Sequence, residues 1–139
     1  MATTRRAHTV WQGSLMEGSG KTTLDSSGLG TFDVTWPARS EEPNGKTSPE
    51  ELIAAAHASC FSMALSNGLA KAGTPPTRLE TSVEVDFVPG TGITEIRIAA
   101  KGDVPGLDAA GFAAAAETAK TNCPVSKALA ATPIVLTVG

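Results

Sequence analysis

One segment limits the possible folds of this chain more than any other, because an apolar stretch follows a strong helix-start signal. Residues 48–51 (SPEE) place serine at the N-cap, proline at the first helical position and glutamate three residues after the serine. This is the pattern of a capping box with an N-terminal proline. It predicts a helix that runs to about Ala72, where Gly73 and the prolines that follow stop it.

The body of this helix, residues 51–70 (ELIAAAHASCFSMALSNGLA), is apolar on nearly all sides and rich in small residues. A helix without a polar face is expected to be buried all round. A chain of 139 residues is too short to cover such a helix by itself. The sequence therefore predicts a homodimer in which two central helices meet across a two-fold axis.

The segments around the helix alternate in polarity and are separated by turn residues. Strands are predicted at 7–11, 21–25, 31–36, 78–88, 93–101 and 133–138, helices at 109–122 and 125–131, and an exposed loop at 37–48. Pro124 suits the first position of the second of these helices. Strands at both ends of the helices predict an α+β fold with a single domain over residues 1–139.

Composition excludes several classes of protein. The chain has 11 basic and 14 acidic side chains, a net charge of −3 and 41% hydrophobic residues, which is typical of a soluble globular protein. No run of lysine and arginine is dense enough for nucleic acid or an anionic membrane surface. We expect no apolar stretch near the ~20 residues that cross a bilayer. The N-terminal residues lack the apolar core of a signal peptide, so we expect a cytoplasmic protein.

Only two cysteines, Cys60 and Cys123, are present. A reducing compartment argues against a permanent structural disulfide. With only His8 and His57 as further ligands, the cysteines match no structural zinc pattern. Residue types and spacing leave two interpretations open, either buried apolar side chains or a redox couple.

The two cysteines lie in different local settings. Cys60 is in the middle of the long helix and gains nothing from its N-terminal dipole, so a low thiol pKa would need a cation from elsewhere. Cys123 precedes a short helix, where a thiolate or a leaving group is favoured. His57 lies one turn before Cys60, a spacing that is compatible with a cysteine–histidine dyad. We prefer the interpretation that His57 is a buried, hydrogen-bonded core residue.

Two motifs make the chain recognisable. Residues 48–65 (SPEELIAAAHASCFSMAL) and 122–129 (NCPVSKAL) resemble the two cysteine segments of the OsmC family of osmotically inducible peroxidases. Shorter matches at 8–11, 36–39 and 104–107 extend the resemblance over essentially the whole chain. The first motif is more similar to OsmC than to the related Ohr organic hydroperoxide resistance proteins. The resemblance implies the OsmC-like fold, with antiparallel sheets around two central helices and an intertwined homodimer.

The resemblance also implies an activity, namely a thiol-dependent peroxidase for organic hydroperoxides and hydrogen peroxide, without metal or haem. It assigns Cys60 as the peroxidatic cysteine and Cys123 as the resolving cysteine that forms an intrachain disulfide with it. It assigns Arg39 as the stabiliser of the thiolate and Glu50 as the residue that orients the arginine. The implied reductant is a lipoyl protein, a thioredoxin-like protein or a small thiol.

Helix geometry adds a constraint on Glu50. This residue and Cys60 are ten positions apart, about 15 Å along one helix, so Glu50 cannot serve Cys60 of its own chain directly. If two central helices run antiparallel, each active site is shared between two chains. The alternatives to a peroxidase are a dimeric, stress-related small-molecule binding protein, whose cysteines are structural, and a peroxide sensor.

Overall fold

The computed structural model describes residues 1–139, which form two compact units, residues 1–49 and residues 50–139. Each unit has a three-stranded sheet of its own. The two units are therefore described one after the other. That the whole chain forms a single OsmC-like domain stays a prediction.

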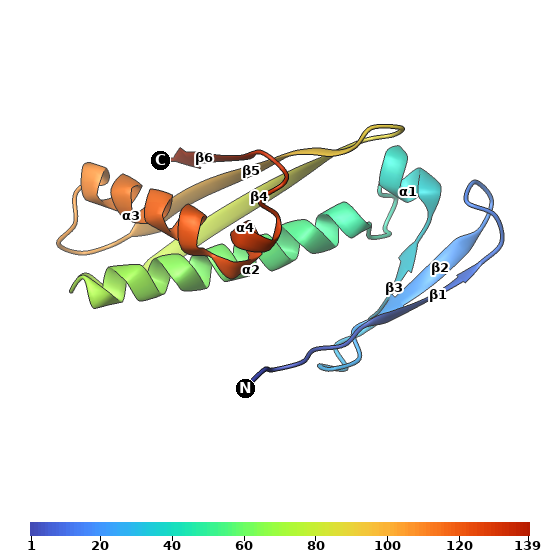
Figure 1. The fold of residues 1–139 in the computed structure, drawn as a ribbon, viewed down its shortest axis with the longest axis horizontal. Coiled ribbons are helices and arrows are strands. Elements are labelled where there is room, and N and C mark those ends of the chain that lie inside the picture. Colours follow the sequence, from blue (N-terminus) through green and yellow to red (C-terminus); the bar gives the residue numbers. More distant parts are fainter. The chain divides into compact units, whose positions relative to one another are not determined.

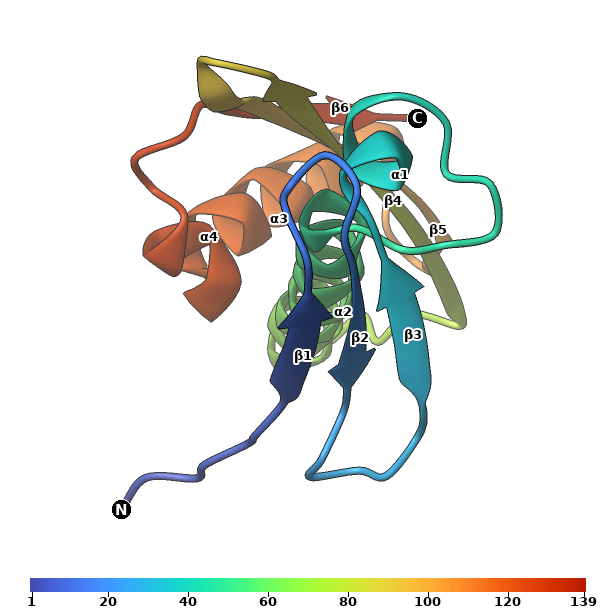
Figure 2. The ribbon, with the colours of Figure 1, turned by 90° about the vertical axis from the view of Figure 1, so that its right-hand side faces the viewer.

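The first unit is built on an antiparallel sheet of β1 (His8–Gln12), β2 (Ser19–Thr23) and β3 (Thr31–Val34), in that order. Figure 2 shows the three strands side by side. The second strand lies two residues earlier than predicted, because Ser19 pairs with Gln12 and Thr23 with His8 across the first hairpin.

A short helix, α1 (Trp36–Ser40), follows β3. The prediction of a loop over 37–48 is therefore wrong for its first residues. The Thr35 hydroxyl accepts a hydrogen bond from the Ala38 N–H at 3.1 Å and caps the helix. Pro37 suits the first turn, where its missing N–H leaves no hydrogen bond unmade. Arg39 lies in the last turn of α1 and is half-buried.

The second unit contains β4 (Arg78–Val88), β5 (Gly92–Asp103) and β6 (Ile134–Val138) in one sheet. The predicted hairpin is present, since β4 and β5 pair antiparallel. The last strand differs from the expected antiparallel arrangement, because β6 runs parallel to β5. A parallel pair needs a crossover, and α3 (Ala109–Asn122) and α4 (Pro124–Ala128) lie within it.

The central helix, α2 (Pro49–Lys71), begins at the predicted proline and ends one residue before Ala72. Gly73 has a φ of +92°, and the Thr74 N–H reaches back to the Leu69 carbonyl at 2.9 Å. This is the backbone arrangement that closes many helix C-termini. Figures 1 and 2 show α2, α3 and α4 on the same face of the β4–β5–β6 sheet.

The core of this unit lies between the helices and the sheet. Its buried apolar residues are Phe61, Leu65, Leu69, Ile96, Ile98, Ala100, Val104, Ala116, Ala119 and Cys123. The α2 contribution is a stripe with a spacing of four residues, which begins at His57 and ends at Leu69.

Within one chain, α2 is buried along this stripe and not all round. Met63, in the middle of the helix, is 71% exposed. By length and composition alone α2 is also apolar enough to cross a membrane, so the expectation of no such stretch is wrong. The core helix of a soluble protein passes the same test, and here the buried stripe of α2 packs against the sheet.

Candidate functional site

The second unit brings the two cysteines together. Cys60 is half-buried in the middle of α2, and Cys123 is fully buried. Cys123 is both the C-cap of α3 and the N-cap of α4. Both thiols are free, and the Cys60 thiol hydrogen-bonds to Cys123. Two reduced cysteines from distant parts of the sequence therefore share one site.

The surroundings shift the pKa values of the two thiols in opposite directions. Burial raises the pKa of the Cys60 thiol, and the hydrogen bond and the charge of Cys123 raise it further. The backbone N–H of Val125 acts in the opposite direction but does not reverse the shift. Only the thiolate is nucleophilic, so a raised pKa makes Cys60 less reactive. Its position in the middle of α2 predicts this absence of activation by its own helix.

Burial alone would raise the pKa of Cys123, but hydrogen bonds from Cys60 and Ser126 and the Val125 N–H together lower it. The Cys123 side chain makes no conventional N-cap hydrogen bond, so the backbone N–H groups act on it as nearby dipoles. The lowered pKa of Cys123 has the direction predicted for the start of the short helix, with the hydrogen bond from Cys60 as the first lowering contribution and the α4 groups after it.

A second polar pair lies beside the cysteines. His57 Nε2 is 2.7 Å from Ser126 Oγ, and both side chains are buried. Burial lowers the pKa of His57, so the imidazole is neutral, and its Nδ1 has no partner. These contacts agree with the preferred interpretation of a buried, hydrogen-bonded histidine. Ser126 was missed, although its place in the NCPVSKAL motif, three residues after Cys123, was a usable signal.

A groove runs along α2 and α3 beside Cys60, with a volume of about 850 Å³. Small and apolar side chains dominate its walls, among them Met63, Ala64, Ala115 and Ala119. Asn67, Thr118 and Asn122 add a few polar groups. An apolar groove with few polar groups is typical of small-molecule sites, and Cys60 is its only thiol.

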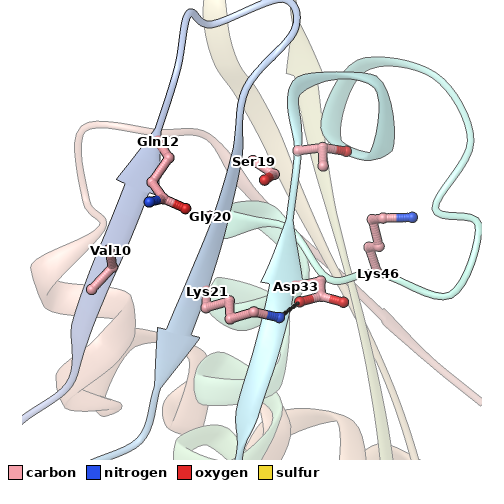
Figure 3. A pocket seen from close by; sticks show the side chains of 8 residues that line it. Val10, Gln12, Ser19, Gly20, Lys21, Asp33 and Lys46 are labelled. Atoms are coloured by element: carbon pink, nitrogen blue, oxygen red, sulfur yellow. Dashed lines mark hydrogen bonds and ion pairs between the residues drawn. The ribbon is translucent and has the colours of Figure 1, made fainter.

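A second hollow lies on the sheet of the first unit and is polar (Figure 3). Lys21 Nζ pairs with Asp33 Oδ1 at 2.7 Å, and this hydrogen bond and charge lower the pKa of Asp33. The lining includes no cysteine and no histidine. The hollow offers hydroxyl and amine groups but no thiol, so thiol chemistry is to be sought at Cys60.

The other two predicted site residues lie elsewhere. Glu50 is in the first turn of α2 and only 6% exposed, which is unusual for a carboxylate unless it is paired. Arg39 belongs to the first unit. The structure thus brings together Cys60 and Cys123 but not Glu50 with Cys60 of its own chain. The roles of Arg39 and Glu50 toward Cys60 stay predictions.

Sequence comparison gives the site a context. Residues 42–138 match the family model described as OsmC-like protein. The chain is 39% identical over 130 residues to the protein named Peroxiredoxin OsmC from Escherichia coli strain K12, a match that covers 91% of this chain and 90% of the relative. The protein of the same name from Shigella flexneri matches with the same identity and coverage.

Solved structures agree at the level of the fold. An organic hydroperoxide resistance protein OsmC from Legionella pneumophila is 26% identical, with a TM-score of 0.71 over 100% of this chain and 98% of that chain. The organic hydroperoxide resistance protein OhrB of Bacillus subtilis is 24% identical, with a TM-score of 0.69 over 96% of this chain and 98% of that chain. The chain therefore belongs to the OsmC family, on its OsmC branch.

Proposed function

We propose that this protein reduces organic hydroperoxides and hydrogen peroxide, with Cys60 as the peroxidatic and Cys123 as the resolving cysteine. The observation that carries the proposal is the meeting of two free thiols between α2 and the start of α4. The prediction of a peroxide-reducing enzyme is confirmed at the level of the family, through the relative named Peroxiredoxin OsmC. The roles of the individual residues are our proposal.

The chemistry has two steps in this proposal. The Cys60 thiolate attacks one peroxide oxygen, the O–O bond breaks, and the departing alkoxide takes up a proton to become an alcohol. Cys60 is left as a sulfenic acid. Cys123 then attacks the Cys60 sulfur and forms an intrachain disulfide, which a thiol reductant returns to two thiols. A lipoyl protein, a thioredoxin-like protein or a small thiol fits this last step.

Cys60 needs help to become a thiolate, since burial and Cys123 both raise its pKa. A guanidinium group is a suitable activator, because it stays charged at every relevant pH and can donate several hydrogen bonds. We assign this role to Arg39. We assign to Glu50 the task of orienting the arginine, for which a buried carboxylate is well suited.

The distance along α2 makes the proposed active site an interchain one. Glu50 and Cys60 of one chain are separated by about 15 Å of helix rise, whereas an antiparallel partner helix would bring its own Glu50 toward Cys60. The exposed apolar side chains of Met63, Trp11 and Phe32 also call for a covering surface. A homodimer with two shared active sites meets both needs.

The groove beside Cys60 favours a substrate with an apolar tail. Its walls are mostly apolar, so the alkyl or aryl part of an organic hydroperoxide would be buried there. We therefore expect organic hydroperoxides to react faster than hydrogen peroxide. We propose a cytoplasmic location for the activity, because the proposed thiol reductants are kept reduced there.

Two measurements test the proposed function. The first is thiol-dependent consumption of cumene hydroperoxide by the parent protein, by Cys60→Ser and by Ser59→Ala, an exposed neighbour as the matched control. Equal rates for the parent and Cys60→Ser would reject the proposal. The second is the intact mass after one equivalent of peroxide, where we expect a loss of two hydrogen atoms. An unchanged mass would favour a binding protein with structural cysteines.

A further inference from the structure

Two pairs of side chains connect α2 with α4, and they follow the two helices in opposite chain directions. On α2, His57 and Cys60 are three positions apart, and Cys123 and Ser126 have the same spacing at the start of α4. Cys60 meets Cys123, and His57 Nε2 lies 2.7 Å from Ser126 Oγ. The histidine–serine bond therefore joins the two helices one turn away from the thiols.

The histidine–serine pair is well suited to fix this geometry. Both side chains are buried, and so is the neighbouring Cys123, which belongs to the core. In a buried setting water cannot replace the hydrogen bond, and its loss leaves polar groups unsatisfied. The bond thus limits how far α4 can move or turn against α2.

The protons of the pair can be assigned by counting donors. Ser126 has a single O–H, and its hydroxyl acts on the Cys123 sulfur as a hydrogen-bond donor. With that O–H directed at the sulfur, the 2.7 Å contact with His57 pairs the Nε2–H as donor with Ser126 Oγ as acceptor. His57 is left neutral, with a lone pair on Nδ1, the buried atom that lacks a partner.

We infer that Ser126 and His57 are positioning residues for the resolving step, because their bond holds the first turn of α4, and with it Cys123, against α2 beside Cys60. This inference rests on the proposed function. The Cys123 thiolate attacks the sulfur of the Cys60 sulfenic acid, the S–S bond forms, and the S–O bond breaks. Hydroxide leaves and combines with the proton that the Cys123 thiol released to solvent on ionisation, so that the net product is water. Cys123 is oxidised, the sulfenic sulfur is reduced, and Ser126 keeps its proton throughout.

Few other groups bear on the Cys123 sulfur. From α2 it faces the Cys60 thiol and, through Ser126, the neutral imidazole of His57. From α4 it faces the Ser126 hydroxyl and backbone N–H and the Val125 N–H. On the α3 side, the Cys123 N–H bonds to the Ala119 carbonyl at 2.8 Å. Ser126 is thus the one side chain of α4 that acts on this sulfur as a donor.

The test uses the full chain with three variants and one matched control. Ser126→Ala removes the donor, His57→Leu removes its support, and His57→Gln restores an N–H donor of similar reach. The control is Ser62→Ala, since Ser62 is a half-buried serine of α2 whose hydroxyl bonds to Thr81 at 2.8 Å instead. Circular dichroism verifies that each variant is folded.

Two readouts separate positioning from a purely structural role. One is the rate of disulfide closure after one equivalent of hydrogen peroxide, followed by quenched mass spectrometry with a sulfenic acid trap. The other needs no peroxide and is the Cys123 pKa in a Cys60→Ser background, read from the ultraviolet absorbance of the thiolate.

We expect Ser126→Ala and His57→Leu to slow disulfide closure about tenfold or more, the effect of one hydrogen bond lost to a charged sulfur. In the Cys60→Ser background the same changes raise the Cys123 pKa. His57→Gln recovers most of the rate, and Ser62→Ala behaves as the parent. If His57→Leu does not fold, the closure rate and the Cys123 pKa of Ser126→Ala test the inference.

Three results would overturn the inference. They are an unchanged closure rate in Ser126→Ala, an unmoved Cys123 pKa in that variant, and an equal slowing by Ser62→Ala, which would indicate a general packing effect. If the parent protein forms no disulfide, the proposed function fails. The Cys123 titration then decides alone, and an unmoved pKa overturns the role of Ser126.

Discussion

His57 Nε2 lies 2.7 Å from Ser126 Oγ, although 69 positions separate the two residues along the chain. The bond closes the N-terminal turn of α4 onto α2 in a place that water does not reach. It also commits the imidazole to its neutral form, because a protonated ring would place a second N–H beside no acceptor. The stability of the fold should therefore depend on the protonation of this histidine.

The first prediction concerns pH. Burial lowers the pKa of His57 from its ordinary value of 6.5, so the unfolded chain binds this proton more readily than the folded chain. Its contribution to stability is present above about pH 6.5 and is lost as the pH falls through the folded pKa. We expect His57→Gln, which does not titrate, to show a flatter fall in the free energy of unfolding on acidification.

Urea unfolding at a series of pH values measures this effect. His8→Gln is the matched control, because His8 is exposed in the first unit and pairs with Asp25 at 2.8 Å. The control should keep the steeper acid dependence of the parent. Parallel curves for the parent and His57→Gln would show that His57 is not responsible.

The second prediction concerns the core. Phe61 is fully buried in the α2 stripe, so Phe61→Ala removes a large side chain and leaves a cavity. We expect a loss of about 3–5 kcal/mol in the free energy of unfolding. Leu29→Ala is the control, since Leu29 is 79% exposed, and it should change stability by less than about 0.5 kcal/mol. Similar losses for both variants would contradict the assigned core.

The third prediction concerns assembly. Met63 lies on the exposed apolar face of α2, so Met63→Glu would bury a charge in the proposed helix–helix contact. We expect sedimentation velocity to show a dimer for the parent and a monomer for Met63→Glu at micromolar concentration. Thr91→Glu adds the same charge in the exposed β4–β5 turn and should stay dimeric. A parent protein that sediments as a monomer would remove the basis for shared active sites.

The fourth prediction concerns activation of the thiol. If Arg39 stabilises the Cys60 thiolate, Arg39→Ala slows the first oxidation by about tenfold to a hundredfold, the scale of a lost charged hydrogen bond. Arg39→Lys should recover only part of this rate, because lysine lacks the planar, forked donor group. Arg78→Ala is the control, since the exposed Arg78 side chain pairs with Glu80 in β4. An Arg39→Ala variant as fast as the parent would remove this assignment.

The fifth prediction separates the two cysteines. Cys123→Ser should still react with one equivalent of peroxide, but its oxidation stops at a Cys60 sulfenic acid that a trapping reagent captures. Turnover with a thioredoxin-like reductant or a lipoyl protein should fall sharply, because no intrachain disulfide forms for them to attack. A trapped sulfenic acid on Cys123 in the Cys60→Ser variant would instead reverse the assignment of the two roles.

Local signals account for the elements that could be predicted. The capping pattern before α2 and the glycine after it act within a few residues, so both helix ends were found to within a residue. Strong alternation identified β4 and β5 in the same way. The short helix α1 was missed because the sequence at Trp36 and Pro37 is equally compatible with the end of a strand.

What could not be predicted depends on contacts between distant residues. Nothing in the residues near Ser126 indicates that an imidazole from α2 will bond to it. The parallel direction of β6 depends on how the connection through α3 and α4 crosses back to the start of the sheet edge beside β5. Even the pairing of Cys60 with Cys123 came from the family resemblance, since their spacing alone also allowed two unrelated core cysteines.

The parallel pairing of β5 and β6 has a consequence for the order in which the protein matures during synthesis. Cys60 leaves the ribosome well before Cys123, and the segment with α3, Cys123 and α4 is fixed at both of its ends only when β6 docks on β5. Such long-range pairing is slow to form. A nascent chain therefore carries the Cys60 thiol before the proposed resolving cysteine is available, so that protection against over-oxidation comes late in synthesis.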